Sequence, residues 1–176
     1  MKTYLRVLLP LALLAVLGLP AAAQTEITGI NWELSRLEGK NRLPFAPVTA
    51  LRASPELKFT DRLRGLVALR NASAAPVEGL VLRYAVRLRL IKKGDAPEKA
   101  FWGAPCYFEE VRVTKINPAS ERQVKLLRFD LAEQLRRLRN TGFYPTAIKL
   151  EVMIGPRLGD SPESITRESA LEIAKI

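Results

Sequence analysis

Arginines that alternate with apolar residues are the feature of this sequence that most directly suggests chemistry. Arg83, Arg87 and Arg89 interleave with an apolar row: Leu80, Leu82, Tyr84, Val86, Leu88 and Leu90. Because side chains alternate faces along a strand, this pattern predicts a strand with one cationic and one apolar face. Guanidiniums two or four residues apart on a strand lie about 7–13 Å from each other, a spacing that can follow a phosphate or sulfate polymer. These three arginines are therefore a candidate anion-binding row.

The alternative for the arginine row is a structural role on a solvated strand face. The chain carries 28 Lys and Arg against 18 Asp and Glu, a net charge of +10, and the acids lie among the bases. These acids are numerous enough to pair with most arginines of the sheet, so we expect the structural role. The face that carries the arginines has no aromatic stacking residues of the kind that single-strand binders use, which argues against nucleic acid as a partner.

Aromatic residues gather around a turn later in the chain. Phe101, Trp102, Tyr107 and Phe108 flank Pro105 and are a candidate contact surface for a partner protein or a sugar. The alternative is that they plug one end of the folded domain, with the proline shaping the bend, and this is the interpretation we favour. Trp32 belongs to the core on either interpretation, because it shares a strand face with Ile30 and Leu34.

Catalytic residue patterns are missing from the sequence. There is no histidine, no Gly-x-Ser-x-Gly, no Gly-rich phosphate loop, no Cys-x-x-Cys and no carboxylate metal loop. Cys106 has no histidine base and is expected to be a buried small apolar residue. Glu109 and Glu110 are adjacent, so a strand would place them on opposite faces. We therefore expect no enzyme, and no catalytic, cofactor or metal site.

The first residues resemble a secretory signal peptide. Lys2 and Arg6 precede an apolar run over residues 7–17, and three alanines, Ala21 to Ala23, follow Pro20. This order predicts a signal peptide over residues 1–23, cleaved after Ala23, and one domain over residues 24–176. An uncleaved membrane anchor is the alternative, although the apolar run is short for a span of about 20 residues.

The single cysteine bears on the compartment. Cys106 is the only cysteine, so an intramolecular disulfide cannot form. Small secreted animal domains usually contain several disulfides, so we expect a bacterial periplasmic or secreted protein. In that setting the sequon that begins at Asn71 is a chance match at a turn and not a glycan site.

Most of the remaining sequence predicts strands. Alternation predicts strands over residues 30–34, 62–70, 80–90, 109–113, 122–129, 146–154 and 171–173. Prolines make residues 39–55 an irregular segment with room for one edge strand. One helix is expected over about residues 131–140, with Asp130 as its N-cap, Glu133 completing a capping box and Gly142 ending it.

Two facing antiparallel sheets are the economical way to bury so many one-sided strands, so the expected fold is an all-β sandwich with one short helix. The run from Leu66 to Tyr84 and the turn Asn117-Pro118-Ala119-Ser120 resemble the core of bacterial immunoglobulin-like or fibronectin-like envelope modules. This resemblance implies an immunoglobulin-like sandwich that serves as a binding or structural module.

From these features we expect the protein to act as a non-catalytic interaction or structural module of the bacterial cell envelope. Another envelope protein is the expected partner. The alternative is a binder of anionic polysaccharide or lipid head groups through the arginine-rich sheet faces.

Overall fold

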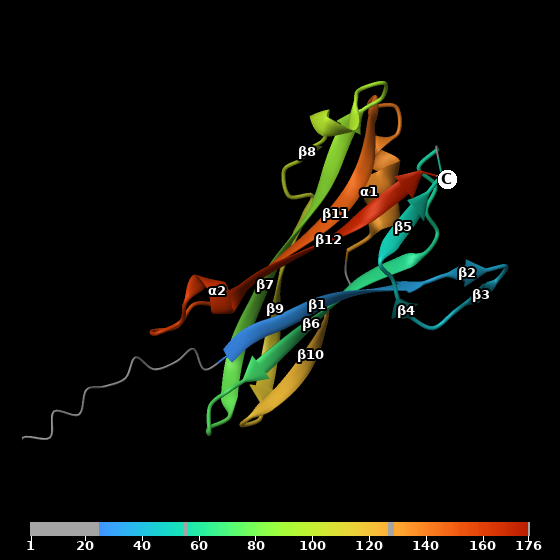
Figure 1. Cartoon of the computed structure of the whole chain (residues 1–176). Coiled ribbons are helices and arrows are strands. Elements are labelled where there is room, and N and C mark those ends of the chain that lie inside the picture. Colours follow the sequence, from blue (N-terminus) through green and yellow to red (C-terminus); the bar gives the residue numbers. More distant parts are fainter. Residues whose placement is uncertain (1–24, 55, 127–128, 176) are drawn as a thin grey trace, which may run out of the picture.

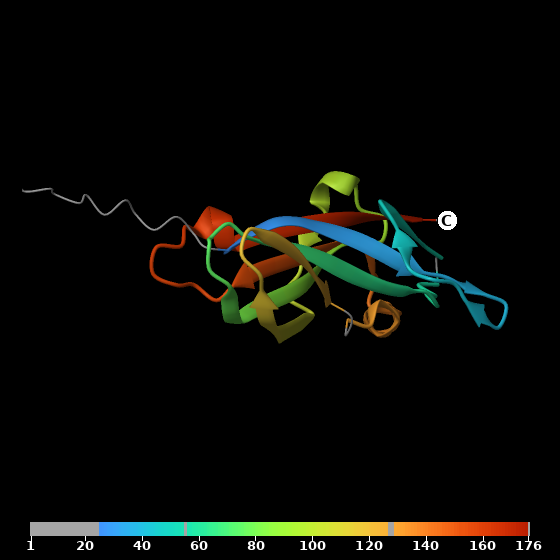
Figure 2. The same ribbon diagram turned by 90° about the horizontal axis from the view of Figure 1, so that it is seen from below.

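The computed structural model describes residues 25–54, 56–126 and 129–175, which form two packed sheets (Figures 1 and 2). The predicted signal peptide over residues 1–23 lies outside these residues. In Figure 1 the strands of one sheet cross those of the other at an angle. The expected all-β class, with antiparallel sheets and one short helix beside them, is confirmed.

The smaller sheet has four strands. Their order is β10 (Ser120–Leu126), β6 (Arg62–Asn71), β1 (Thr25–Ser35) and β4 (Ala46–Pro47), all antiparallel to their neighbours. β1 is longer than expected and contains a bulge between Ile27 and Gly29. A two-stranded hairpin, β2 (Leu37–Glu38) and β3 (Asn41–Arg42), projects beyond the sandwich at one end (Figure 1).

The larger sheet is built on the strand with the arginine row. Its order is β5 (Ala50–Ala53), β12 (Thr166–Lys175), β11 (Phe143–Ile154) and β7 (Val77–Lys92), with β8 (Phe101–Trp102) and β9 (Tyr107–Ile116) sharing the far edge of β7. β5 and β12 are parallel, unlike the antiparallel pairing expected throughout. The proline-rich segment explains this exception, because it takes the chain from β4 in the smaller sheet to β5 in the larger one. Residues 39–55 therefore supply three short strands, β3, β4 and β5, instead of the one edge strand expected.

The helix α1 (Leu131–Leu138) begins where the sequence predicts. The Asp130 side chain accepts a hydrogen bond from the Glu133 amide at 3.1 Å, the first half of a capping box. The second half of the predicted capping box does not form. The Glu133 carboxylate does not turn back to the Asp130 backbone amide but accepts hydrogen bonds from Arg136 and Arg137 one turn later. The helix ends at Leu138, before Gly142 is reached. A one-turn helix α2 (Pro162–Ile165) and a 3-10 turn (Pro97–Lys99) were not expected.

The core lies between the two sheets. Seven residues that alternation assigns to the interior are all buried in one cluster: Leu82, Tyr84, Val86, Leu88, Ile148, Leu150 and Val152. Leu90, at the end of the row, is only half-buried. Trp32 is buried as expected, and its Nε1 donates to the Ser169 hydroxyl across the sandwich at 3.0 Å. The period-2 pattern therefore identifies the inward faces of β7 and β11 correctly.

Asn71 ties two connections together at one end of the sandwich. Its side-chain amide donates to the carbonyls of Ala75, Ile116 and Asn117, and its Oδ1 accepts from the backbone and hydroxyl of Ser73. The residue is fully buried. The β6–β7 connection and the β9–β10 turn are thus bonded to a single side chain, and the amide nitrogen of the sequon is occupied by structural hydrogen bonds.

Candidate functional site

Strand register decides which side chains share the outer face of the six-stranded sheet, the face turned away from the core. Residues directly opposite each other on neighbouring strands point to the same side. One row across the sheet contains Phe108, Ala85, Glu151 and Glu168; the next contains Glu110, Arg83, Met153 and Thr166. These side chains come from β9, β7, β11 and β12, so only the pairing of four strands brings them together.

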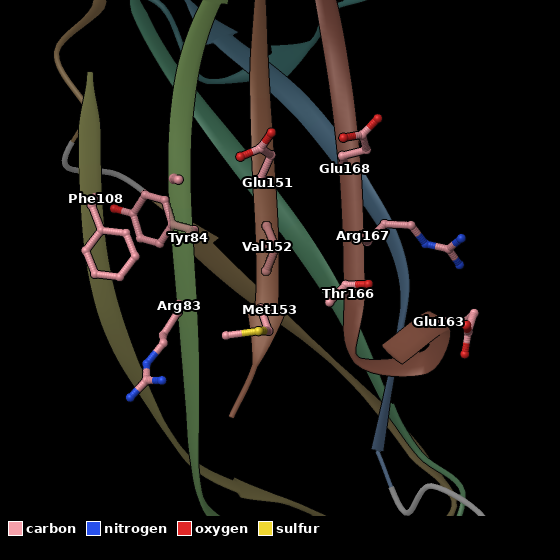
Figure 3. A pocket seen from close by; sticks show the side chains of 11 residues that line it. Arg83, Tyr84, Phe108, Glu151, Val152, Met153, Glu163, Thr166, Arg167 and Glu168 are labelled. Atoms are coloured by element: carbon pink, nitrogen blue, oxygen red, sulfur yellow. The ribbon is translucent and has the colours of Figure 1, made fainter. Parts of the chain in front are cut away.

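A hollow of about 710 Å³ lies across these two rows. Figure 3 shows Phe108 on one side of it, Arg83 and Met153 near its middle, and Thr166 and Glu163 on the other side. The surface is depressed at Ala85, because this small side chain lies directly between the larger Phe108 and Glu151 in the register. Phe108 is 63% exposed. The hollow is therefore an open surface depression with a large apolar side chain at its rim.

Several charged residues in and around the hollow form ion pairs within the molecule. Arg83 Nε lies 2.6 Å from Glu110 Oε1, and Arg87 Nε lies 2.9 Å from Glu151 Oε2. Lys149 Nζ bridges Glu151 and Glu168 at 2.8 and 3.0 Å. Hydrogen bonds to these two carboxylates raise the pKa of Lys149. Burial works to raise the pKa of Glu151, but the hydrogen bonds from Lys149 and Arg87 outweigh it and hold that pKa below its ordinary value.

The three arginines of the candidate anion-binding row share this face but differ in their contacts. Arg83 and Arg87 have the carboxylate partners described above, and Arg87 also donates to the Gly103 carbonyl. Arg89 is half-buried, and no ion pair of Arg89 occurs among the residues that the structure describes. Pairing of two of the three favours their structural role, and anion binding stays a prediction.

Replacing Arg83, Arg87 and Arg89 together with serine tests the anion-binding row. Exposed charge pairs contribute about 0–1 kcal/mol each, so we expect the melting temperature to change little. We expect retention on a heparin column at low salt to stay near that of the parent, because two of the three guanidiniums already have carboxylate partners. Loss of retention by a variant that still folds would assign polyanion binding to this row.

The aromatic residues around Pro105 do not plug the sandwich as we favoured. Phe101, Trp102 and Phe108 are exposed, whereas Tyr107 is half-buried on the inner face, where its ring centroid lies 5.9 Å from that of Tyr84. The physical reason is that β8 and β9 are both strands on the edge of β7. Alternation along them directs Phe108 outward, and Trp102 lies opposite the outward-facing Arg89. The Lys149 ammonium lies 5.0 Å from the centre of the Trp102 ring.

The remaining candidates for chemistry have structural partners. Glu109 and Glu110 lie on opposite faces as expected: Glu109 accepts from the Tyr84 hydroxyl at 2.5 Å on the inner side. Burial, with this hydrogen bond second, raises the pKa of Tyr84. Cys106 is half-buried and not fully buried as predicted; its thiol contacts the Val86 carbonyl, and burial raises its pKa.

Among residues 25–54, 56–126 and 129–175, no three His, Cys, Asp or Glu side chains are grouped as a metal site. No helix within those same ranges has the length and apolar composition required to cross a bilayer.

No family model and no curated protein matches the chain. Among solved structures, a similar chain is Spo0M, a sporulation control protein from Bacillus subtilis, with 11% sequence identity and a TM-score of 0.32. The match covers 87% of this chain and 49% of that chain, so the protein spans about half the length of Spo0M. At this TM-score the likeness carries no functional argument.

The hollow itself was missed by sequence reasoning. The sequence pattern does not identify Ala85, Met153 or Glu168 as site residues, because none of them departs from what is usual on the outer face of a strand. One feature of the sequence does indicate this site. Phe108 and Met153 are large apolar residues at positions that alternation assigns to the solvent side of their strands. Two such residues on different strands become a site only once the register is known.

Proposed function

We propose that the protein is a non-catalytic interaction module of the bacterial cell envelope that binds another envelope protein through the hollow on its six-stranded sheet. The observation that carries the proposal is Phe108, a large apolar side chain that stands 63% exposed at the rim of a depression of about 710 Å³. Apolar groups gathered around a surface depression and rimmed by charged residues are typical of contact sites for partner proteins.

The ion pairs beside Phe108 support the same proposal. The Arg83–Glu110 and Arg87–Glu151 pairs are formed within the molecule, so a partner that covers them does not leave single charges buried. Around an aromatic anchor, such groups exclude water and add little binding energy of their own. A binding surface of this kind requires neither catalysis nor a cofactor.

The envelope location in this proposal comes from the sequence. Residues 1–23 have the order of a signal peptide, and the run from Leu66 to Tyr84 resembles immunoglobulin-like envelope modules. The all-β fold is compatible with such modules and with many other functions.

Photo-crosslinking tests the proposed surface in living cells. The photoreactive residue p-benzoylphenylalanine replaces Phe108 in one strain and Arg70 in a control strain, since Arg70 is exposed on the smaller sheet. We expect a discrete adduct with an exported protein from the Phe108 position only. Adducts of equal yield from both positions would contradict the proposal.

Binding by the purified partner then measures the contribution of Phe108. Truncating an aromatic anchor of an interface typically costs more than about 1.4 kcal/mol, which is tenfold in affinity. We therefore expect Phe108→Ser to raise the Kd at least about tenfold. Phe101→Ser is the matched control, because Phe101 is exposed on the same sheet edge but does not line the hollow. Equal effects of the two substitutions would place the interface elsewhere.

A further inference from the structure

The hollow is locally acidic in a basic protein, and this limits what can bind there. We propose that the partner presents an extended segment with an apolar side chain against Phe108 and a lysine or arginine beside Glu163 and Glu168. This inference rests on the proposed function, because it names the chemistry of the partner at the same surface. The guanidiniums of the hollow are already bonded, its carboxylates are not all neutralised, and the distance between its two ends suits an extended segment.

Two arginines line the hollow, and the guanidinium of each is bonded within the molecule. Arg83 pairs with Glu110 on the outer face. Arg167 lies in register with Val152 on the inner face, and its Nη2 donates to the Ile27 carbonyl of β1 at 3.2 Å. A partner carboxylate would have to compete with these contacts. The two cations are therefore poor sites for a new anionic ligand.

The carboxylates of the hollow differ from one another in how far they are neutralised. Glu151 is bonded to both Arg87 and Lys149. Glu168 shares Lys149 with Glu151, and its side chain is 66% exposed. Glu163 is exposed, and the structure shows no ion pair for it within the described ranges. The charge still open to a ligand is therefore negative and lies at the β12 and α2 side, opposite Phe108 (Figure 3).

Charge complementarity accordingly favours a cationic group at this side of the hollow. The chain as a whole has a net charge of +10, which attracts anions over most of its surface. A basic partner segment gains nothing from that general field and depends on the local carboxylates. Those carboxylates therefore select the site at which such a segment binds.

The separation of the two ends indicates an extended segment. Phe108 and Glu168 lie in one row across β9, β7, β11 and β12, three strand spacings of about 4.8 Å apart, or about 14 Å. In an extended chain, side chains four positions apart share a face and lie about 13 Å from each other. An apolar residue and a basic residue four positions apart would therefore reach Phe108 and Glu168 at the same time.

Selection of peptides on the purified protein tests this chemistry. The probe is a displayed library of random 12-residue peptides, and only peptides whose binding is lost in Phe108→Ser are analysed. We expect these to carry Lys or Arg about four positions from an aliphatic or aromatic residue. We expect the double variant Glu163→Gln, Glu168→Gln to weaken their binding at least fivefold at low salt. Glu172→Gln is the matched control on the same strand and face, and it should leave binding unchanged.

The outcomes separate the two proposals. Peptides that depend on Phe108 but lack a basic residue, or that bind the double variant equally well, would overturn the charge preference and leave the binding surface intact. A selection without any Phe108-dependent peptide would count against both the surface and its charge preference. Phe108-dependent peptides that carry Asp or Glu in place of the basic residue would show that the hollow takes anions and would overturn the inference.

Discussion

Replacing Val86 with aspartate is expected to prevent the protein from folding. Val86 is 2% exposed and lies at the centre of β7, opposite Leu150 of β11 and Tyr107 of β9. An aspartate there would have to bury an unpaired carboxylate, which costs several kcal/mol or more even after a pKa shift. The whole free energy of unfolding of a domain is only about 5–15 kcal/mol. The loss at this one position is therefore large enough to abolish the folded state.

Circular dichroism and the yield of soluble protein measure this effect. We expect Val86→Asp to be insoluble, or to show no cooperative thermal transition. Thr114→Asp is the matched control, because it adds the same carboxylate at an exposed position of β9 and should melt close to the parent. A soluble Val86→Asp protein with an unchanged melting curve would refute the assignment of this strand and its inner face.

Substituting Asn71 by alanine is expected to lower the free energy of unfolding by about 3–5 kcal/mol. The Asn71 amide donates to three carbonyls, and its oxygen accepts two hydrogen bonds from Ser73, all at a fully buried position. Each buried group left without a partner costs about 1–3 kcal/mol. Because water cannot reach this position in the parent fold, only partial compensation by local rearrangement is expected.

Urea denaturation with linear extrapolation measures the loss. Asn31→Ala is the matched control, since Asn31 is exposed on β1 and has no side-chain hydrogen bond within the described residues. We expect this control to lie within about 0.5 kcal/mol of the parent. If Asn71→Ala were no more destabilising than the control, the two connections would not depend on this side chain for their positions.

The sequence predicts the structure correctly where a given residue type at a given spacing is compatible with only one local conformation. Alternation of apolar and polar residues identified β6, β7 and β11 and their buried rows, because a strand has only two faces and only one can be covered. Asp130 marked the start of α1, because a short acidic side chain satisfies the free amides of a first helical turn. These are local rules that depend on few neighbours.

Local rules failed wherever two groups compete for one partner. Glu133 has the position of a capping-box residue, but Arg136 and Arg137 follow it on the same helix face and bind its carboxylate. The sequence pattern contains both possibilities and does not rank them. The aromatic residues around Pro105 are a similar case, because which of them face the core depends on the register of β8 and β9 with β7.

What the sequence by itself determined is the long strands, their inner faces and the helix α1, since each follows from the spacing of neighbouring residues. Only the tertiary structure decided which strands are neighbours, that β5 runs parallel to β12, and that Asn71 is buried beside residues 116 and 117. The same holds for the hollow, because Phe108 and Glu168 are sixty residues apart and meet through the register of four strands. Register is the sum of many weak cross-strand contacts and turn geometries, and none of these can be deduced from one segment alone.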